Sequence, residues 1–148
     1  MKVKEGMTVK VTSLSPEMNA REALDLLLKM EISGLPVVDS NNKLIGMFTE
    51  KGVLRTLLPG YIEKVGTFTY HENPKMIKQK VAALATMTVK EIMREDVITV
   101  NEETALSEVA RIMLVQKVRR LPVLNNNKEL VGIIARVDVL KALFAEQN

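Results

Sequence analysis

Apolar and polar residues alternate along the chain, first with helical and then with extended spacing. Five apolar residues occupy the i, i+3, i+4, i+7 and i+8 positions of one helix face, which predicts an amphipathic helix. They are Ala20, Ala23, Leu24, Leu27 and Leu28. Asn19 and Glu22 have the spacing of a capping box at the start of this helix. We therefore expect a helix that begins next to Asn19.

Extended segments flank the predicted helix. Lys10–Leu14, before it, is short and rich in strand-forming residues. The apolar runs Leu35–Val38 and Leu44–Phe48, after it, are typical of buried strands. Turn-forming residues at 39–42 join the two runs as a hairpin. A second helix, Glu50–Leu58, completes the predicted order of strand, helix, strand, strand, helix.

The same pattern returns 86 residues later. The matches at this offset include Leu35-Pro36-Val37 with Leu121-Pro122-Val123, Gly46 with Gly132, and Met7 with Met93. In the second copy the strands are predicted at Leu121–Leu124 and Leu130–Ala135, and the closing helix at Val137–Ala145. Each copy, at about 50–60 residues, is small for an independent domain. Two copies can bury each other's apolar faces, so we expect an α/β (α+β) fold of tandem β-α-β-β-α repeats.

The offset divides the chain into three segments. The first repeat covers 1–58, an inter-repeat linker 59–86, and the second repeat 87–148. The linker is longer than a plain connection, and Lys75–Leu84 within it is a candidate helix. His71, the single histidine, lies in the linker. We interpret it as an exposed residue, because the sequence around it offers no metal-ligating or catalytic partner.

Composition narrows the class of protein. The chain has no cysteine, which excludes disulfides and thiolate sites and suits a reducing cytoplasm. No apolar run approaches the ~20 residues of a membrane span. The N-terminus lacks the apolar core of a signal peptide. We therefore expect a cytoplasmic protein that does not contact a membrane.

Charge and the candidate reactive residues narrow the class of protein further. The net charge is +3, and the excess of basic residues lies in the second half of the chain. The charges are interspersed, and only two tyrosines and three phenylalanines are present, which disfavours nucleic-acid binding. Neither repeat contains a phosphate-binding loop, a metal-ligand cluster or a nucleophile–base pair. We predict that the protein is not an enzyme and has no resident metal or cofactor.

Both repeats carry residues that resemble a known family. The segments concerned are Ser33–Asp39 and Leu44–Thr49 in the first copy, and Val118–Leu124 and Leu130–Asp138 in the second. Each repeat resembles a CBS motif, and the chain as a whole resembles a CBS-domain pair, or Bateman module. It is similar to the stand-alone members, which carry the sensor without an attached enzyme. The resemblance implies packing around a pseudo-twofold axis and a homodimer.

The resemblance also implies a ligand. In this family a cleft holds an adenosyl ligand such as AMP, ADP, ATP or S-adenosylmethionine, and a Gly-apolar-apolar-Thr/Ser-x-x-Asp segment supplies its polar contacts. The second copy keeps the acid as Asp138 but has Ala135 in place of the hydroxyl residue. The first copy keeps Thr49 but has Gly52 in place of the acid. This implies one ribose-binding site at Asp138 and a degenerate site at Gly52.

Nine other residues would complete the Asp138 cleft in the family's geometry. They are Lys10, Val11 and Thr12 for the adenine, Ile32, Ser33 and Pro36 for an apolar wall, and Arg119, Arg120 and Arg136 for the phosphates. Guanidinium groups bind phosphate oxygens bidentately. Three arginines therefore favour a phosphorylated nucleotide over S-adenosylmethionine, whose sulfonium is cationic.

We predict a regulatory module that binds an adenine nucleotide, AMP or ATP, between its repeats and modulates an unidentified partner protein. Two alternatives stay open. One is a structural or interaction module with degenerate sites that acts through dimerisation, which Ala135 and Gly52 favour. The other is a sensor of S-adenosylmethionine. The expected dimer surface lies on the closing helices, at Val53, Leu57, Leu58, Leu140 and Leu143.

Overall fold

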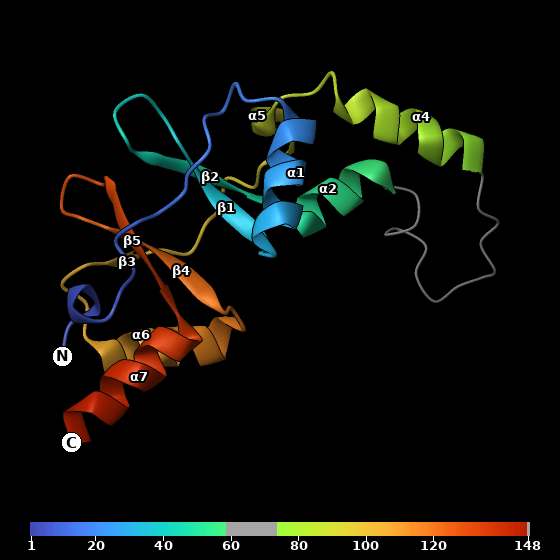
Figure 1. The fold of residues 1–148 in the computed structure, drawn as a ribbon. Coiled ribbons are helices and arrows are strands. Elements are labelled where there is room, and N and C mark those ends of the chain that lie inside the picture. Colours follow the sequence, from blue (N-terminus) through green and yellow to red (C-terminus); the bar gives the residue numbers. More distant parts are fainter. Residues whose placement is uncertain (59–73, 148) are drawn as a thin grey trace. The chain divides into compact units, whose positions relative to one another are not determined.

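The computed structural model describes residues 1–58 and 74–147 (Figure 1). The interpretation of His71 falls outside these residues. The elements in chain order are η1 (Val3–Glu5), α1 (Ala20–Met30), β1 (Gly34–Val38), β2 (Leu44–Thr49), α2 (Glu50–Leu57), α4 (Pro74–Leu84), α5 (Val89–Ile92), β3 (Val100–Asn101), α6 (Leu106–Gln116), β4 (Arg120–Leu124), β5 (Leu130–Ala135) and α7 (Arg136–Gln147). The mixed α/β fold expected from the sequence is confirmed, and α4 is the helix predicted in the linker.

These elements form two compact units. Unit 1 contains residues 1–12, 40–44 and 97–148, and unit 2 contains 13–39 and 45–96. Residues 1–12, the N-terminal arm of the first repeat, thus belong to the unit that holds most of the second repeat. Residues 87–96, the arm of the second repeat, belong to the unit that holds most of the first. Sequence repeats and structural units are two different divisions of the chain.

Unit 1 contains a three-stranded sheet in the order β3-β4-β5. β3 runs parallel to β4, and β4 runs antiparallel to β5. The N-terminal arm pairs with β5 through two hydrogen bonds: Thr8 N–H donates to Ile133 O at 2.9 Å, and Ile133 N–H donates to Thr8 O at 3.0 Å. A Cβ on Gly132 would stand 2.6 Å from Met7 Sδ. Glycine is therefore required where the arm crosses β5.

Unit 2 repeats this arrangement at the 86-residue offset. β1 pairs with β2, Leu14 bridges Val37 in parallel, and Met47 bridges Arg94 in the antiparallel sense. The strand predicted over Lys10–Leu14 is wrong, because only Leu14 pairs. The chain leaves unit 1 after Thr12 and enters unit 2 at Ser13, so this segment cannot run along one sheet.

Each unit has its own apolar core, and the cores correspond residue by residue. Leu14, Ala23, Leu27, Leu35, Val37, Phe48, Val53 and Val89 lie in the core of unit 2. Their counterparts in unit 1 are Val100, Val109, Met113, Leu121, Val123, Ile134, Val139 and Val3. The expected dimer-surface position of Val53 is therefore wrong. Val53 is 3% exposed, because it lies on the side of α2 that packs into the core.

Local signals in the sequence explain the helix and turn boundaries. Asn19 caps α1, its Oδ1 accepting the N–H groups of Arg21 at 2.9 Å and Glu22 at 3.1 Å. The residues that follow α1 and α6 are their C-caps, Glu31 and Lys117, and both are left-handed with φ of 56°. The hairpin turns use Asn42 and Lys128 in the same conformation. These residues again match at the offset, so the backbone follows the repeat as closely as the cores do.

Candidate functional site

Polar residues expected at the nucleotide site gather at one end of unit 1. Arg120 is paired with Ala135 across β4 and β5. Arg136, the first residue of α7, donates its N–H to Arg119 O at 3.0 Å. The start of β4, the end of β5 and the start of α7 therefore meet, and they bring Arg119, Arg120 and Arg136 together with Asp138.

The three arginine side chains are exposed. None of them forms an ion pair or a side-chain hydrogen bond within the described part of the chain. Such guanidinium groups can take an anion without first breaking a salt bridge. In unit 2 the equivalent positions are Ser33, Gly34 and Glu50, so only unit 1 concentrates positive charge at this end of its hairpin.

Asp138 lies in the first turn of α7 and is partly buried. Its Oδ2 accepts a hydrogen bond from Ala135 N–H at 2.8 Å. This bond satisfies an amide at the helix N-terminus and fixes the orientation of the carboxylate. Oδ1 makes no hydrogen bond among the described residues. Asp138 can therefore accept hydrogen bonds from a ligand while it keeps its structural bond.

Thr49 caps the equivalent helix in unit 2. It is the N-cap of α2, and its Oγ1 accepts Gly52 N–H at 3.0 Å. In a complete capping box the hydroxyl residue and the acid three positions later each cap the other's amide. Here the first repeat keeps the hydroxyl half in Thr49, and the second keeps the acid half in Asp138. Both residues are needed for local structure, whether or not a ligand is bound.

The Gly52 position is closely surrounded. A Cβ there would lie 3.3 Å from Ile92 O, 3.4 Å from Thr49 Oγ1 and 3.5 Å from Ile92 Cγ2. Unit 2 therefore has neither the carboxylate nor open space beside the start of α2.

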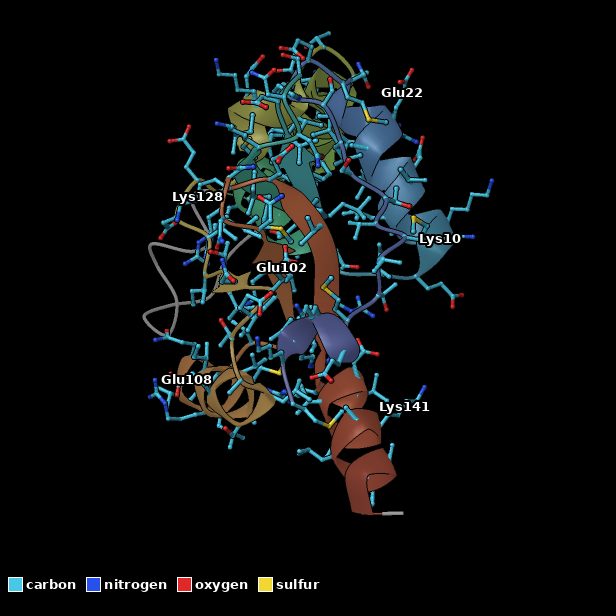
Figure 2. The ribbon with its side chains drawn as sticks, turned by 90° about the vertical axis from the view of Figure 1, so that its left-hand side faces the viewer. Lys10, Glu22, Glu102, Glu108, Lys128 and Lys141 are labelled. Carbon is cyan, nitrogen blue, oxygen red and sulfur yellow. The ribbon has the colours of Figure 1, made fainter. Side chains whose placement is uncertain are left out.

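The other expected contact residues are divided between the units. In unit 1, Lys10 and Thr12 are exposed and Val11 is partly buried, all without regular structure. The Lys10 side chain is labelled in Figure 2. In unit 2, Ser33 O accepts Glu50 N–H at 2.9 Å, Ile32 packs against the core, and Pro36 is fully buried. Each unit thus holds its own members of the expected cleft, and their joint role stays a prediction.

A charged cluster at the N-terminal arm was not predicted from the sequence. Lys2 Nζ lies 2.5 Å from Glu103 Oε2, and Lys4 Nζ lies 2.7 Å from Glu103 Oε1. Hydrogen bonds from Lys2 and Lys4 lower the pKa of the Glu103 carboxyl to about 2. Only the exchange of arms between repeats, which no local pattern encodes, brings these residues together.

The described residues form neither a metal-binding group nor a membrane-spanning helix. In the described ranges, 1–58 and 74–147, no group of three or more His, Cys, Asp or Glu side chains is arranged to hold a metal ion. None of the helices in these ranges is long and apolar enough to cross a bilayer.

A family model describes this arrangement of two repeats. The model of the CBS domain matches residues 3–59 and 89–145. The chain belongs to the CBS domain family. The resemblance drawn from the sequence is therefore confirmed, and the two matched segments fall on the two sequence repeats.

Solved CBS structures have the same fold. CBSX2, a CBS-pair protein of Arabidopsis thaliana solved in complex with AMP, has a TM-score of 0.74 at 26% identity, covering 99% of this chain and 98% of that one. The CBS domain pair of protein MJ0100, in complex with 5'-methylthioadenosine and S-adenosyl-L-methionine, has a TM-score of 0.66 at 24% identity, covering 100% and 98%. The second comparison supports the fold alone.

Curated CBS relatives are longer than this chain. The chloroplastic CBS domain-containing protein CBSX1 of Arabidopsis thaliana is 33% identical over 139 residues, which are 87% of this chain and 57% of CBSX1. An inosine-5'-monophosphate dehydrogenase of Methanocaldococcus jannaschii is 31% identical over 140 residues, which are 95% of this chain and 23% of that enzyme. The chain thus spans just over half of one relative and about a quarter of the other.

Proposed function

We propose that this CBS pair is a non-catalytic regulatory module that binds an adenine nucleotide at Asp138. The observation that supports this best is the combination at the start of α7: an oriented carboxylate beside three arginines, with one carboxylate oxygen and all three guanidinium groups making no bond to any described side chain. The carboxylate suits a ribose diol, and the arginines suit phosphate. The relative CBSX2, with 26% identity, was solved with AMP, which supports the same class of ligand here.

The proposal includes one strong site per chain. Unit 2 has Gly52 where unit 1 has Asp138, and Thr49 Oγ1 already accepts Gly52 N–H. Three neighbouring arginines, which make no ion pair within 1–58 and 74–147, favour AMP, ADP or ATP over the cationic S-adenosylmethionine. Binding would act on an unidentified partner protein by favouring one packing state of the module, since a ligand shifts an equilibrium only through different affinities for the two states.

A homodimer is the second part of the proposal. Leucines at equivalent positions are exposed in both units: Leu28 at 59% and Leu114 at 75%, and Leu54 at 54% and Leu140 at 55%. A second copy has the same internal repeat, so the exposed leucines of each unit could pack against those of the other copy. The alternative of a purely structural or interaction module is favoured by the loss of the hydroxyl at Ala135 and of the acid at Gly52.

Calorimetry and thermal unfolding with AMP, ADP, ATP and S-adenosylmethionine test the proposal. A nucleotide at 100 times its Kd should add about 2.7 kcal/mol, which corresponds to a rise in Tm of roughly 5–11 °C for a chain of this size. We expect about one nucleotide per chain. No heat and no Tm shift with any of the four compounds would reject nucleotide sensing and favour the interaction module.

Asp138→Asn is the sharpest variant, because the side-chain oxygen of Asn can still accept Ala135 N–H. The helix cap is kept, while the second acceptor becomes an NH2 donor. We expect an unchanged Tm without ligand and a loss of the nucleotide-induced shift. Thr49→Val is the matched control at the equivalent end of unit 2, and it should leave nucleotide binding intact.

A further inference from the structure

Two methionines related by the 86-residue offset lie where the arms cross the hairpins. A Cβ on Gly132 would stand 2.6 Å from Met7 Sδ, and a Cβ on Gly46 would stand 2.7 Å from Met93 Sδ. Each sulfur therefore lies against a glycine backbone with no room for a methyl group. Each methionine also packs against the core of its own unit. The same contact of a thioether with a glycine thus occurs once in each unit.

The residue after each methionine joins the arm to the sheet. In unit 1, Thr8 exchanges two backbone hydrogen bonds with Ile133, at 2.9 and 3.0 Å. In unit 2, Arg94 exchanges two backbone hydrogen bonds with Met47, both at 2.9 Å. A change in the volume or polarity of the preceding side chain therefore acts directly on these bonds.

Sulfur chemistry in this sequence is confined to thioethers, because it has nine methionines and no cysteine. Met76 is 51% exposed, so its oxidation would leave a sulfoxide in water, whereas Met113 is 2% exposed and shielded from an oxidant. Met7 and Met93 are partly exposed. No other methionine supplies one of the closest atoms to a described glycine. These two therefore combine access to solvent with a contact that cannot expand.

A sulfoxide would not fit at either place. Oxidation adds an oxygen atom to the sulfur and turns a flexible apolar side chain into a polar one. The polar atom beside each sulfur at the glycine is a carbonyl oxygen, Thr8 O at 2.9 Å or Arg94 O at 2.8 Å from the same Cβ position. A carbonyl cannot donate a hydrogen bond to the sulfoxide oxygen. The new oxygen would therefore gain neither space nor a partner from this carbonyl.

We propose that Met7 and Met93 are a matched pair of oxidation sites, and that a peroxide loosens the arms of both units by converting these thioethers to sulfoxides. The sulfur attacks one oxygen of hydrogen peroxide, the S–O bond forms and the O–O bond breaks. The departing hydroxide takes the proton from the new S–OH group and leaves as water. The sulfur loses two electrons and the peroxide gains them.

Loosening of the first arm has a consequence for the candidate nucleotide site. The arm continues from Met7 into Lys10, Val11 and Thr12, which are the residues expected to contact adenine. Oxidation would therefore weaken nucleotide binding, and this consequence rests on the proposed function. The loosening itself does not depend on it.

Graded treatment of the full chain with hydrogen peroxide tests the proposal. Peptide mapping by mass spectrometry measures the oxidation of each methionine, and hydrogen exchange is followed at the amides of Thr8, Ile133, Met47 and Arg94. We expect exchange there to become about tenfold faster or more, and Tm to fall by roughly 5 °C or more. Both changes should follow the oxidation of Met7 and Met93, after the more exposed Met76 has reacted.

The double variant Met7→Leu with Met93→Leu removes both sulfurs and nearly conserves the volume. It should keep its Tm and its exchange rates after peroxide treatment. Met18→Leu with Met87→Leu is the matched control, because Met18 and Met87 are also partly buried against an apolar core. The control should respond to peroxide as the wild type does. Equal sensitivity of the first double variant and the wild type would overturn the proposal.

Met7→Gln imitates the sulfoxide without an oxidant, since it places a polar carbonyl on an unbranched side chain of similar length. Exchange at Thr8 and Ile133 should be faster in this variant than in the wild type, and unchanged exchange would contradict the proposal even if the leucine variant failed to fold. Calorimetry with AMP and ATP before and after oxidation provides the separate readout. If the untreated protein binds neither, the proposed function fails and the exchange result still stands.

Discussion

Replacing Gly132 by alanine tests how closely the N-terminal arm must pack against β5 within unit 1. The new Cβ would stand 2.6 Å from Met7 Sδ and 2.9 Å from Thr8 O. The sulfur could move, but Thr8 O belongs to the backbone that pairs with Ile133. Relief therefore requires the N-terminal arm to shift and its two hydrogen bonds to lengthen. Overpacking typically costs about 1–3 kcal/mol, and two backbone hydrogen bonds that are lengthened but not lost add about 1 kcal/mol between them.

We therefore expect Gly132→Ala to lower the free energy of unfolding by about 2–4 kcal/mol, which is roughly 4–16 °C in Tm. Gly46→Ala should behave alike, since its Cβ would lie 2.7 Å from Met93 Sδ and 2.8 Å from Arg94 O. Urea unfolding measures the loss, and hydrogen exchange at Thr8 and Ile133 locates it. Faster exchange should be concentrated at this pair.

Gly52→Ala provides the control. Its Cβ would lie 3.3 Å from Ile92 O, a close contact but a much looser one than the 2.6 Å and 2.9 Å at Gly132, and alanine is favoured over glycine inside a helix by about 1 kcal/mol. We expect the two effects to offset each other and this variant to be close to neutral. If Gly132→Ala were as stable as the wild type, or if Met7→Ala fully rescued it, the backbone contact with Thr8 O would not be the cause, and the reasoning would fail.

Two further predictions concern charge and capping. Because the pKa of Glu103 is lowered from 4.5 to about 2 in the folded protein, its ion pairs stabilise the arm fully above pH 4.5 and are lost as the pH falls toward 2. As the pH is lowered from 4.5 toward 2, the Tm of Glu103→Gln should therefore fall less steeply than the Tm of the wild type. Identical dependence of Tm on pH in the two proteins would contradict the pairing. Thr49→Ala should lower the free energy of unfolding by about 1 kcal/mol, because it removes the cap on Gly52 N–H. Ala135→Thr should raise the free energy of unfolding, because its hydroxyl can cap Asp138 N–H in the same way. Urea midpoints that move in the same direction for both variants would refute the shared capping box.

Local patterns predicted most of the elements correctly, because they depend on neighbours in the sequence. The face of α1, its cap at Asn19 and the boundaries of β5 all follow from spacing and residue type. The 86-residue offset extended these predictions to the second unit. Errors arose where the chain passes from one unit to the other: Lys10–Leu14 looks like a strand, yet the chain changes units within it.

The candidate site was predictable only in part, for the same reason. Asp138, Ala135 and Arg136 are near in sequence, and the hairpin register adds Arg119 and Arg120. The capping roles of Thr49 and Asp138 could have been read from their three-residue spacing to Gly52 and Ala135. The Lys2–Lys4–Glu103 cluster and the burial of Leu84 depend on segments distant in sequence, so no local pattern reveals them.

The exchange of arms has a consequence for dissecting this protein. The chain passes between the units four times, after residues 12, 39, 44 and 96, so neither unit can be excised as a continuous fragment. A fragment ending at residue 58 would keep α1, β1, β2 and α2 but lose Val89 and Ile92 from their core, and its own arm would have no β5 to join. Two such fragments could recover native-like pairing only by exchanging arms with each other. A single repeat is therefore a half-structure that needs a second repeat, in the same chain or in another, to become a domain.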